Sequence, residues 1–428
     1  MSKRQLLYFL SGQLGVMLLA RFFFQWIVSF STQTDGGSES LFSAALVGLV
    51  LLGFRLFDGI TDPIAGAVSD SWVSKGKERR RLLWYWFVIP AIGLFLCFLP
   101  TQAMSVAVRW GVLLVGMLLF FLGYTFYAIP YWSLIGDYSL GEESNRRQLS
   151  NLLGLGLMVA TAIGFVVSPF LVQYLGFVAS ATLFAVVGSV LMILPYYAQP
   201  EGLSHSIVEQ KHAVSLKTLI RDLIEVLKHR DFVALLMIYG GSQMSLTVMT
   251  AASPFIAQSL LGGTTADVAR LMGPLLALSI PSFWLVPYFS KRLGWERVSL
   301  VAALMLAIVY GLSAFVGFGI IGSPMTTAMI IFGLAGPGVA ILLGVEGEAI
   351  TTCAERTGSN QVSMYFGVYN FIVKALNGVA IAVTGIFADL SSGGLGTWAV
   401  RAMPFFAGGS LVVGVILYWR LRMKALRQ

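Results

Sequence analysis

Long apolar runs are the feature that most limits what this chain can fold into. Lipid offers the backbone no hydrogen-bond partner, and a hydrocarbon core of about 30 Å takes about 20 helical residues to cross. The runs therefore predict an all-α membrane protein with twelve transmembrane helices. They lie roughly at 9–30, 41–68, 82–102, 109–137, 149–173, 177–198, 232–260, 267–290, 297–320, 324–350, 363–388 and 399–420.

The composition supports the same class. Of 428 residues, 57% are hydrophobic and 11% are charged, whereas about 25% of residues are charged in an ordinary soluble domain. So little polar surface cannot cover a soluble core, which excludes a secreted disulfide scaffold, a disordered chain and a nucleic-acid-binding protein. Cys97 and Cys353 lie far apart in or beside apolar runs, so we expect neither a disulfide nor a metal site from them.

Basic residues are distributed unevenly among the connections between runs. If the N-terminus lies inside, the outside connections hold only Arg109, Arg270 and Arg401. The inside segments hold the other lysines and arginines, apart from the three that lie deep within the runs. Cytoplasmic loops of membrane proteins carry this excess. We therefore expect a multi-pass protein of the cytoplasmic (inner) membrane with both termini in the cytoplasm. The net charge of +8 follows from that topology.

A polar connection at 199–231 divides the chain into a six-helix half at 1–198 and a second one at 232–428. Its later part, 216–228, alternates apolar and charged residues at helical spacing, which is typical of an interfacial amphipathic helix. Two pseudo-symmetric six-helix halves around a central pathway form the major facilitator fold, which is the architecture we expect.

The second run carries the densest group of charges at membrane depth. Arg55, Asp58 and Asp62 are spaced i, i+3 and i+7, so they share one helical face. Pro63 cannot donate to the carbonyl of Gly59, which leaves that oxygen available. Two carboxylates and a carbonyl predict a site for Na⁺ or a proton. The alternative is that Arg55 neutralises the pair and the three residues only hold helices together.

The eleventh run carries Asn370, Lys374 and Asn377 at i, i+4 and i+7. A lysine at this depth needs a carboxylate partner or a lowered pKa. Asp58 and Asp62 are the carboxylates near the midplane, so we expect Lys374 and Arg55 to act as their charge partners. The alternative for Lys374 is that its side chain reaches the membrane surface.

Further polar and aromatic side chains at membrane depth are candidates for solute binding. Arg21 and Gln25 lie one turn apart in the first run, and Thr125, Tyr131 and Trp132 flank a proline that interrupts the fourth. Aromatic planes beside a helix break suit an amphipathic ligand. Core packing at the kink is the alternative, and Arg21 could instead pair with a carboxylate of the second run. Asn370 and Asn377 complete this group of candidates.

Several of these segments resemble the glycoside–pentoside–hexuronide:cation symporter family, a branch of the major facilitator superfamily that includes melibiose permease. Arg55-x-x-Asp58-x-x-x-Asp62-Pro63 is similar to the family's span-2 signature, and Ile129–Leu134 to its span-4 signature. Met364–Lys374 resembles its span-11 signature, and Leu227–Phe232 resembles the segment before its span 7. The resemblance implies that Asp58 and Asp62 hold the coupling Na⁺, Li⁺ or H⁺, with Lys374 close to them.

The resemblance also implies a cytoplasmic gate built from charge pairs. Gly76-Lys-Glu-Arg79 and Gly294-Trp-Glu-Arg297 occupy equivalent connections in the two halves and form a weak internal repeat. We interpret Glu346 and Glu348, near the cytoplasmic end of their span, as gate or interface residues. The gate residues that we expect are Asp70, Arg79, Arg146, Arg147, Arg297 and Arg356.

Two departures from the family bear on the solute. Sugar-transporting members have an acid in span 1, where this chain has Met17, and an aspartate in span 4, where it has Ala128. Three midplane cations, Arg21, Arg55 and Lys374, therefore face only two midplane carboxylates. This balance favours an anionic or zwitterionic solute over a neutral sugar.

These features together predict a cation-coupled secondary active symporter that works by alternating access. We expect no catalytic residues, no cofactor apart from the coupling Na⁺ or H⁺, no nucleic-acid partner, and a monomer in the lipid bilayer. The solute is a small organic molecule, anionic and glycoside-like or amphipathic. The alternatives are a lysophospholipid or amphiphile transporter of the same fold, and a membrane sensor with a transporter fold.

Overall fold

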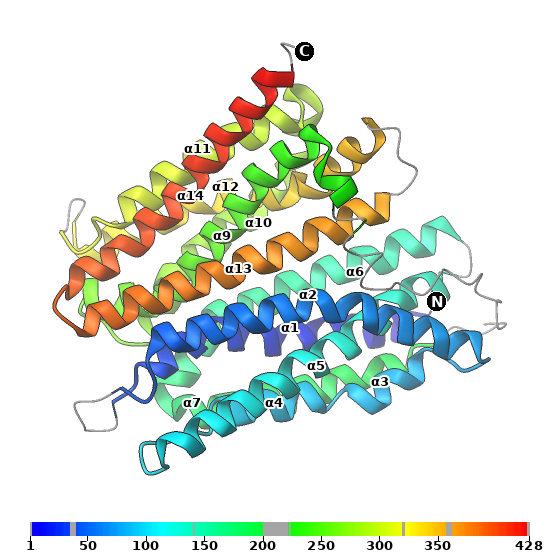
Figure 1. Cartoon of the computed structure of the whole chain (residues 1–428), viewed down its shortest axis with the longest axis horizontal. Helices are drawn as coiled ribbons and strands as arrows, with labels where there is room; N and C mark the ends of the chain where they lie inside the picture. Colours follow the sequence, from blue (N-terminus) through cyan, green and yellow to red (C-terminus); the bar gives the residue numbers. More distant parts are fainter. Residues whose placement is uncertain are drawn as a thin grey trace. The chain divides into compact units, whose positions relative to one another are not determined.

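The structure is a computed structural model that describes residues 2–34, 40–139, 142–199, 221, 224–318, 322–356 and 362–425. All regular elements in these ranges are helices (Figure 1). Eleven of the described helical stretches are long and apolar enough to cross a membrane. The prediction of an all-α membrane protein is confirmed. The amphipathic helix expected at 216–228 lies largely outside the described residues.

One of the eleven stretches accounts for two of the twelve expected spans. Gln148–Tyr197 is 50 residues long, which is about 75 Å of helix against a hydrocarbon core of about 30 Å. Gly176 interrupts it with φ 79° and ψ 173°, a backbone conformation that residues other than glycine rarely adopt. The chain therefore turns at Gly176, where the sequence predicts the boundary between the fifth and sixth spans.

The helices form two compact units. The first unit comprises Met1–Leu41 and Phe57–Ser215, and the second comprises Phe42–Leu56 and Leu216–Gln428. The first unit contains α1 (Lys3–Ser31), the later part of α2 (Ala44–Ser74), α3 (Arg80–Trp86), α4 (Ile89–Cys97), α5 (Val106–Tyr138), α6 (Glu143–Ala162) and α7 (Ser168–Ile193). The second contains the early part of α2, α9 (Arg230–Phe255), α10 (Asp267–Leu293), α11 (Trp295–Ser313), α12 (Pro324–Arg356), α13 (Val362–Ser392) and α14 (Thr397–Ala425).

Helix α1 is the centre of the first unit. In its most apolar stretch 78% of the residues are buried, more than in any other span. Its aromatic side chains pack against α4, α5 and α7, and the indole of Trp26 donates a hydrogen bond of 2.8 Å to the Ser168 hydroxyl of α7. Burying this many aromatic groups in one helix gives the unit a rigid core on which the site residues of α2 and α5 are mounted.

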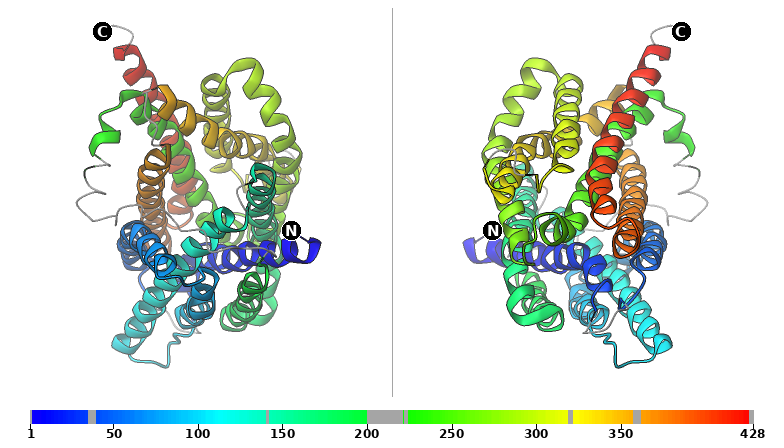
Figure 2. Two further views of the ribbon diagram at one scale, coloured as in Figure 1. Left: turned by 90° about the vertical axis from the view of Figure 1, so that its right-hand side faces the viewer. Right: turned by 90° about the vertical axis from the view of Figure 1, so that its left-hand side faces the viewer.

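Small residues allow the helices of the second unit to approach closely. Helices α9 and α14 lie side by side (Figures 1 and 2), and a methyl group added at Gly414 would lie 2.3 Å from the carbonyl oxygen of Met237. The early part of α2 packs on α13 in the same way. A methyl group at Gly48 would lie 2.7 Å from the Cα of Ala382. This α2–α13 seam is why residues 42–56 group with the second unit.

An acid of α13 fixes the start of α2. The carboxylate of Asp389 accepts hydrogen bonds from the backbone N–H groups of Ala44 at 2.7 Å and Ala45 at 3.0 Å, and from the Ser43 hydroxyl at 2.5 Å. The first backbone N–H groups of a helix have no partner within it and carry partial positive charge, so a carboxylate satisfies and stabilises them. Asp389 is therefore an N-terminal cap supplied by a different helix.

Candidate functional site

The two aspartates of the second span meet one hydroxyl group inside the first unit. Thr125 of α5 has its Oγ1 at 2.6 Å from Asp58 Oδ1 and at 3.4 Å from Asp62 Oδ1. Asp58 and Thr125 are fully buried, and Asp62 is partly exposed. The helical spacing of the aspartates brings both carboxylates to the face of α2 that packs against α5. The sequence placed Thr125 among the solute-binding residues, whereas its hydroxyl lies on the predicted cation site.

This arrangement supplies oxygen ligands from two helices. The Thr125 hydroxyl has one proton, so it can donate to only one carboxylate at a time. Two carboxylates this close repel each other unless positive charge or a proton reduces the repulsion. Helix α2 continues through Pro63, and the carbonyl of Gly59 lacks the backbone donor that another residue there would supply. Carboxylate, hydroxyl and carbonyl oxygens are the ligands that hard cations prefer.

Arg55 lies on the α2–α13 seam opposite Gly378, and Lys374 lies one helical turn from that point on α13. A methyl group at Gly378 of α13 would lie 3.1 Å from the Cβ of Arg55 and 3.0 Å from the Cα of Leu52. Lys374 precedes Gly378 by one helical turn. Both side chains are partly exposed. Both lie inside membrane spans, where contact of a charge with lipid is costly. Pairing of Lys374 with Asp58 or Asp62 stays a prediction.

Tyr131 and Trp132 connect α5 to α1. The Tyr131 hydroxyl donates to the carbonyl of Phe9 at 2.5 Å and accepts from the backbone N–H of Gln13 at 3.0 Å. The indole of Trp132 donates to Gln13 Oε1 at 2.8 Å. Tyr131 is fully buried, while Trp132 is partly exposed. In this structure Tyr131 has the packing position that the sequence left open as an alternative.

The remaining solute candidates are separated between the units. In the first, the Arg21 guanidinium lies 6.0 Å from the ring centroid of Phe165, and Gln25 is fully buried with no hydrogen-bond partner for its amide among the described residues. In the second, Asn377 accepts a 2.8 Å hydrogen bond from Thr247 of α9. Asn370 is exposed on α13.

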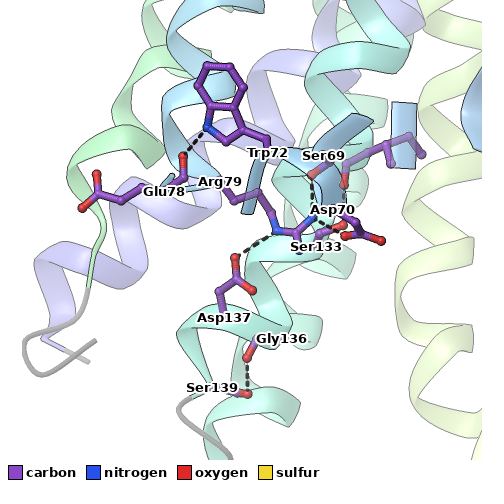
Figure 3. Close-up of polar contacts among 10 residues, drawn as sticks. Ser69, Asp70, Trp72, Glu78, Arg79, Ser133, Gly136, Asp137 and Ser139 are labelled. Atoms are coloured by element: carbon purple, nitrogen blue, oxygen red, sulfur yellow. Dashed lines mark hydrogen bonds and ion pairs between the residues drawn. The ribbon is translucent and has the colours of Figure 1, made fainter. Parts of the chain in front are cut away.

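Arg79 forms a charged cluster at one end of the first unit (Figure 3). Its guanidinium contacts Asp70 Oδ1 of α2 and Asp137 Oδ2 of α5, each at 3.0 Å, and donates to the Ser69 hydroxyl. Arg79 is only 6% exposed. The sequence predicted Asp70 and Arg79 but missed Asp137, although an acid at the end of the fourth span was a signal available in the sequence.

A second charged cluster lies in the second unit, and here one acid contacts two arginines. Glu296 accepts from Arg356 of α12 at 2.7 Å and from Arg422 of α14, and Arg422 also lies 3.4 Å from Asp231. Arg297 is exposed on α11. The side chains of the two other expected gate residues, Arg146 and Arg147, lie outside the described part of the chain.

The weak repeat has a structural basis. Gly76 and Gly294 both have a positive φ, 72° and 77°, so each supplies a turn that favours glycine. In both copies the glutamate is paired, Glu78 with Arg80 at 3.1 Å and Glu296 with Arg356. Burial raises the pKa of Glu78, but Arg80 and Arg81 outweigh it and hold that pKa below its ordinary value.

The helical architecture and the charges at membrane depth define a membrane transporter of the major facilitator type. The chain belongs to the MFS/sugar transport protein family, whose sequence model matches residues 8–409. The resemblance to the glycoside–pentoside–hexuronide:cation symporter branch is confirmed.

Two curated relatives are named as a symporter and a carrier protein homolog. The chain is 22% identical over 355 residues to an uncharacterized symporter, YjmB, of Bacillus subtilis (strain 168), covering 80% of this chain and 74% of that protein. It is 22% identical over 375 residues to a glucuronide carrier protein homolog of Escherichia coli (strain K12), covering 81% and 76%.

Solved structures share the fold. A peptide transporter POT matches with a TM-score of 0.70 at 13% identity, covering 96% of this chain and 93% of that one. The nucleoside transporter NupG matches with a TM-score of 0.65 at 15% identity, covering 98% and 99%. At these identities the likeness shows the fold alone.

Proposed function

We propose that the protein is a secondary active symporter that couples entry of Na⁺ or H⁺ to transport of a small organic solute. The observation that supports this is the convergence of Asp58 and Asp62 on the Thr125 hydroxyl. A cation or proton there lowers the repulsion between the carboxylates, and the potential contributes about 2.3 kcal/mol per charge per 100 mV.

In this proposal the positive charges of Arg55 and Lys374 respond to the coupling ion. Binding at Asp58 and Asp62, with the carbonyl of Gly59, changes the local field on Arg55 and Lys374. The solute then binds, and alternating access carries both across. The Arg79 and Glu296 clusters act as gates on the cytoplasmic side, where the basic connections place both termini.

For the solute, we propose an anionic glycoside. Near the midplane, Arg21, Arg55 and Lys374 outnumber Asp58 and Asp62, and one relative is named a glucuronide carrier protein homolog. A carboxylate on the solute offers these cations a partner once an ion occupies the aspartates, which matters in a site of low dielectric constant.

Transport by reconstituted protein tests the coupling. In vesicles with an inward Na⁺ or proton gradient, the wild type should concentrate labelled 4-nitrophenyl β-D-glucuronide. Asp58→Asn and Asp62→Asn should abolish accumulation while keeping a normal unfolding temperature. Asp267→Asn, which changes a carboxylate at the start of α10, is the matched control. Undiminished accumulation by both site variants would refute the cation site.

A further inference from the structure

Glu346 is an acid inside a membrane span that the cation site does not use. It lies on α12, where about 15 Å of helix separates it from the charged end at Arg356. Its carboxylate accepts a 2.8 Å hydrogen bond from the amide of Gln243 on α9. The side chains that act on it among the described residues are both neutral, Gln243 and Tyr369. An acid at this depth with neutral neighbours is energetically costly, so it is a candidate for a functional role.

A buried hydroxyl lies beside this acid. Tyr369 of α13 is 1% exposed, and its hydroxyl lies close enough to Glu346 and Gln243 to interact with both, but it meets full hydrogen-bond geometry to no described residue. An unsatisfied buried hydroxyl costs roughly 1–3 kcal/mol. A group that satisfies Tyr369 must accept a hydrogen bond from its hydroxyl. A group that satisfies Glu346 as well must also donate a hydrogen bond to its carboxylate.

The surroundings of Glu346 form a polar strip inside the second unit. One turn beyond Gln243 on α9, Thr247 is hydrogen-bonded to Asn377 of α13. Gln243, Thr247, Asn377 and Glu346 are all partly exposed. Polar side chains at this depth face a bundle interior or a water-filled cavity rather than lipid.

We propose that Glu346, Gln243 and Tyr369 form a subsite that binds hydroxyl groups of a polyhydroxylated solute. A hydroxyl donates to the Glu346 carboxylate and accepts from Tyr369, so it satisfies both with one group. A solute carboxylate cannot replace it, because Glu346 would repel that charge. This inference rests on the proposed function and names which part of the solute it contacts.

Binding to the purified full-length protein tests the subsite without transport. Calorimetry compares 4-nitrophenyl β-D-glucuronide with cyclohexanecarboxylate, which keeps the carboxylate and lacks the hydroxyls. We expect Glu346→Gln to weaken glucuronide binding about ten- to a hundredfold, because it removes a charge-assisted hydrogen bond, and to change cyclohexanecarboxylate binding less than twofold. Glu348→Gln, two residues along α12 where the acid accepts from Ser290, is the matched control and should bind both as the wild type does.

Tyr369→Phe keeps the test decisive if Glu346→Gln does not fold. Removing an unsatisfied hydroxyl should leave the unliganded protein at least as stable, yet weaken glucuronide binding severalfold. Glucuronide affinity within twofold of wild type in the folded variants overturns the subsite. So does a wild type that binds cyclohexanecarboxylate but not glucuronide, or that binds neither. None of these outcomes bears on accumulation by Asp58→Asn, which tests the symport proposal separately.

Discussion

Asp389 of α13 holds the backbone N–H of Ala44, the first residue of α2, at 2.7 Å. The contact joins the start of one span to the later part of another that is more than 300 positions away in the sequence. It also marks one end of the α2–α13 seam, which joins the early part of α2 to the second unit.

Replacing Asp389 tests how much this cap contributes. Losing an N-terminal cap costs about 0.5–2 kcal/mol, and Asp389 serves two backbone donors and a hydroxyl. We expect Asp389→Ala to lower the unfolding free energy by about 1–2 kcal/mol, with a smaller effect for Asp389→Asn, which keeps an acceptor. Thermal unfolding in detergent measures both. Equal stability of Asp389→Ala and wild type would show that water caps the helix equally well.

Two glycines of α2 separate packing from helix propensity. Gly48 has no room for a methyl group against Ala382, while Gly53 has nothing within 4 Å. Gly48→Ala should therefore destabilise the protein by about 1–3 kcal/mol, whereas Gly53→Ala should be neutral or stabilising by up to about 1 kcal/mol. Thermal unfolding of the pair gives the answer, and a loss of stability in both variants equally would contradict the seam.

The Thr125 hydroxyl offers a test of the cation site that changes no charge. Thr125→Val keeps the shape and removes the oxygen shared by Asp58 and Asp62. We expect the ion concentration that gives half-maximal uptake to rise about tenfold, which corresponds to one hydrogen bond to a charged group. Thr182→Val, which removes a hydroxyl bound to its own helix in α7, should leave ion dependence unchanged. An unaltered ion dependence in Thr125→Val would remove Thr125 from the site.

The repeated arginines provide a matched pair. Arg79→Gln leaves Asp70 and Asp137 without their shared partner, so we expect it to lower the unfolding free energy by about 1–3 kcal/mol. Arg297→Gln changes the equivalent but exposed arginine and should stay within about 0.5 kcal/mol. Adding Asp137→Asn to Arg79→Gln should restore part of the loss. A double variant that is no more stable than Arg79→Gln alone would place the cost elsewhere.

The sequence predicts the fold of this chain well because lipid leaves the backbone few choices. Span positions follow from length and hydropathy, and the turn at Gly176 falls where the fifth and sixth runs meet. Helical spacing also places Asp58 and Asp62 on one face, which the structure shows against α5.

The partners of these residues follow from helix rotation, which a single sequence does not reveal. Periodicity in a helix buried on several sides gives no clear outward face, so Thr125 and Tyr131 were indistinguishable as lining or packing residues. Contacts such as Asp137 with Arg79 depend on which helix ends meet, and these depend on the topology of the whole unit.

Helix α2 changes packing partners between Leu56 and Phe57, next to the turn that carries Asp58. Asp389 thus holds the start of this continuous helix, and Asp58 and Asp62, the acids of the proposed cation site, lie just past the change. Thermodynamic reciprocity then links two equilibria: if ion occupancy alters by some factor how strongly α2 adheres to α13, ion affinity differs by the same factor between the joined and the separated seam. If the proposed symport holds, a signal between the seam and the two aspartates would need no relay through other helices, because both lie on α2.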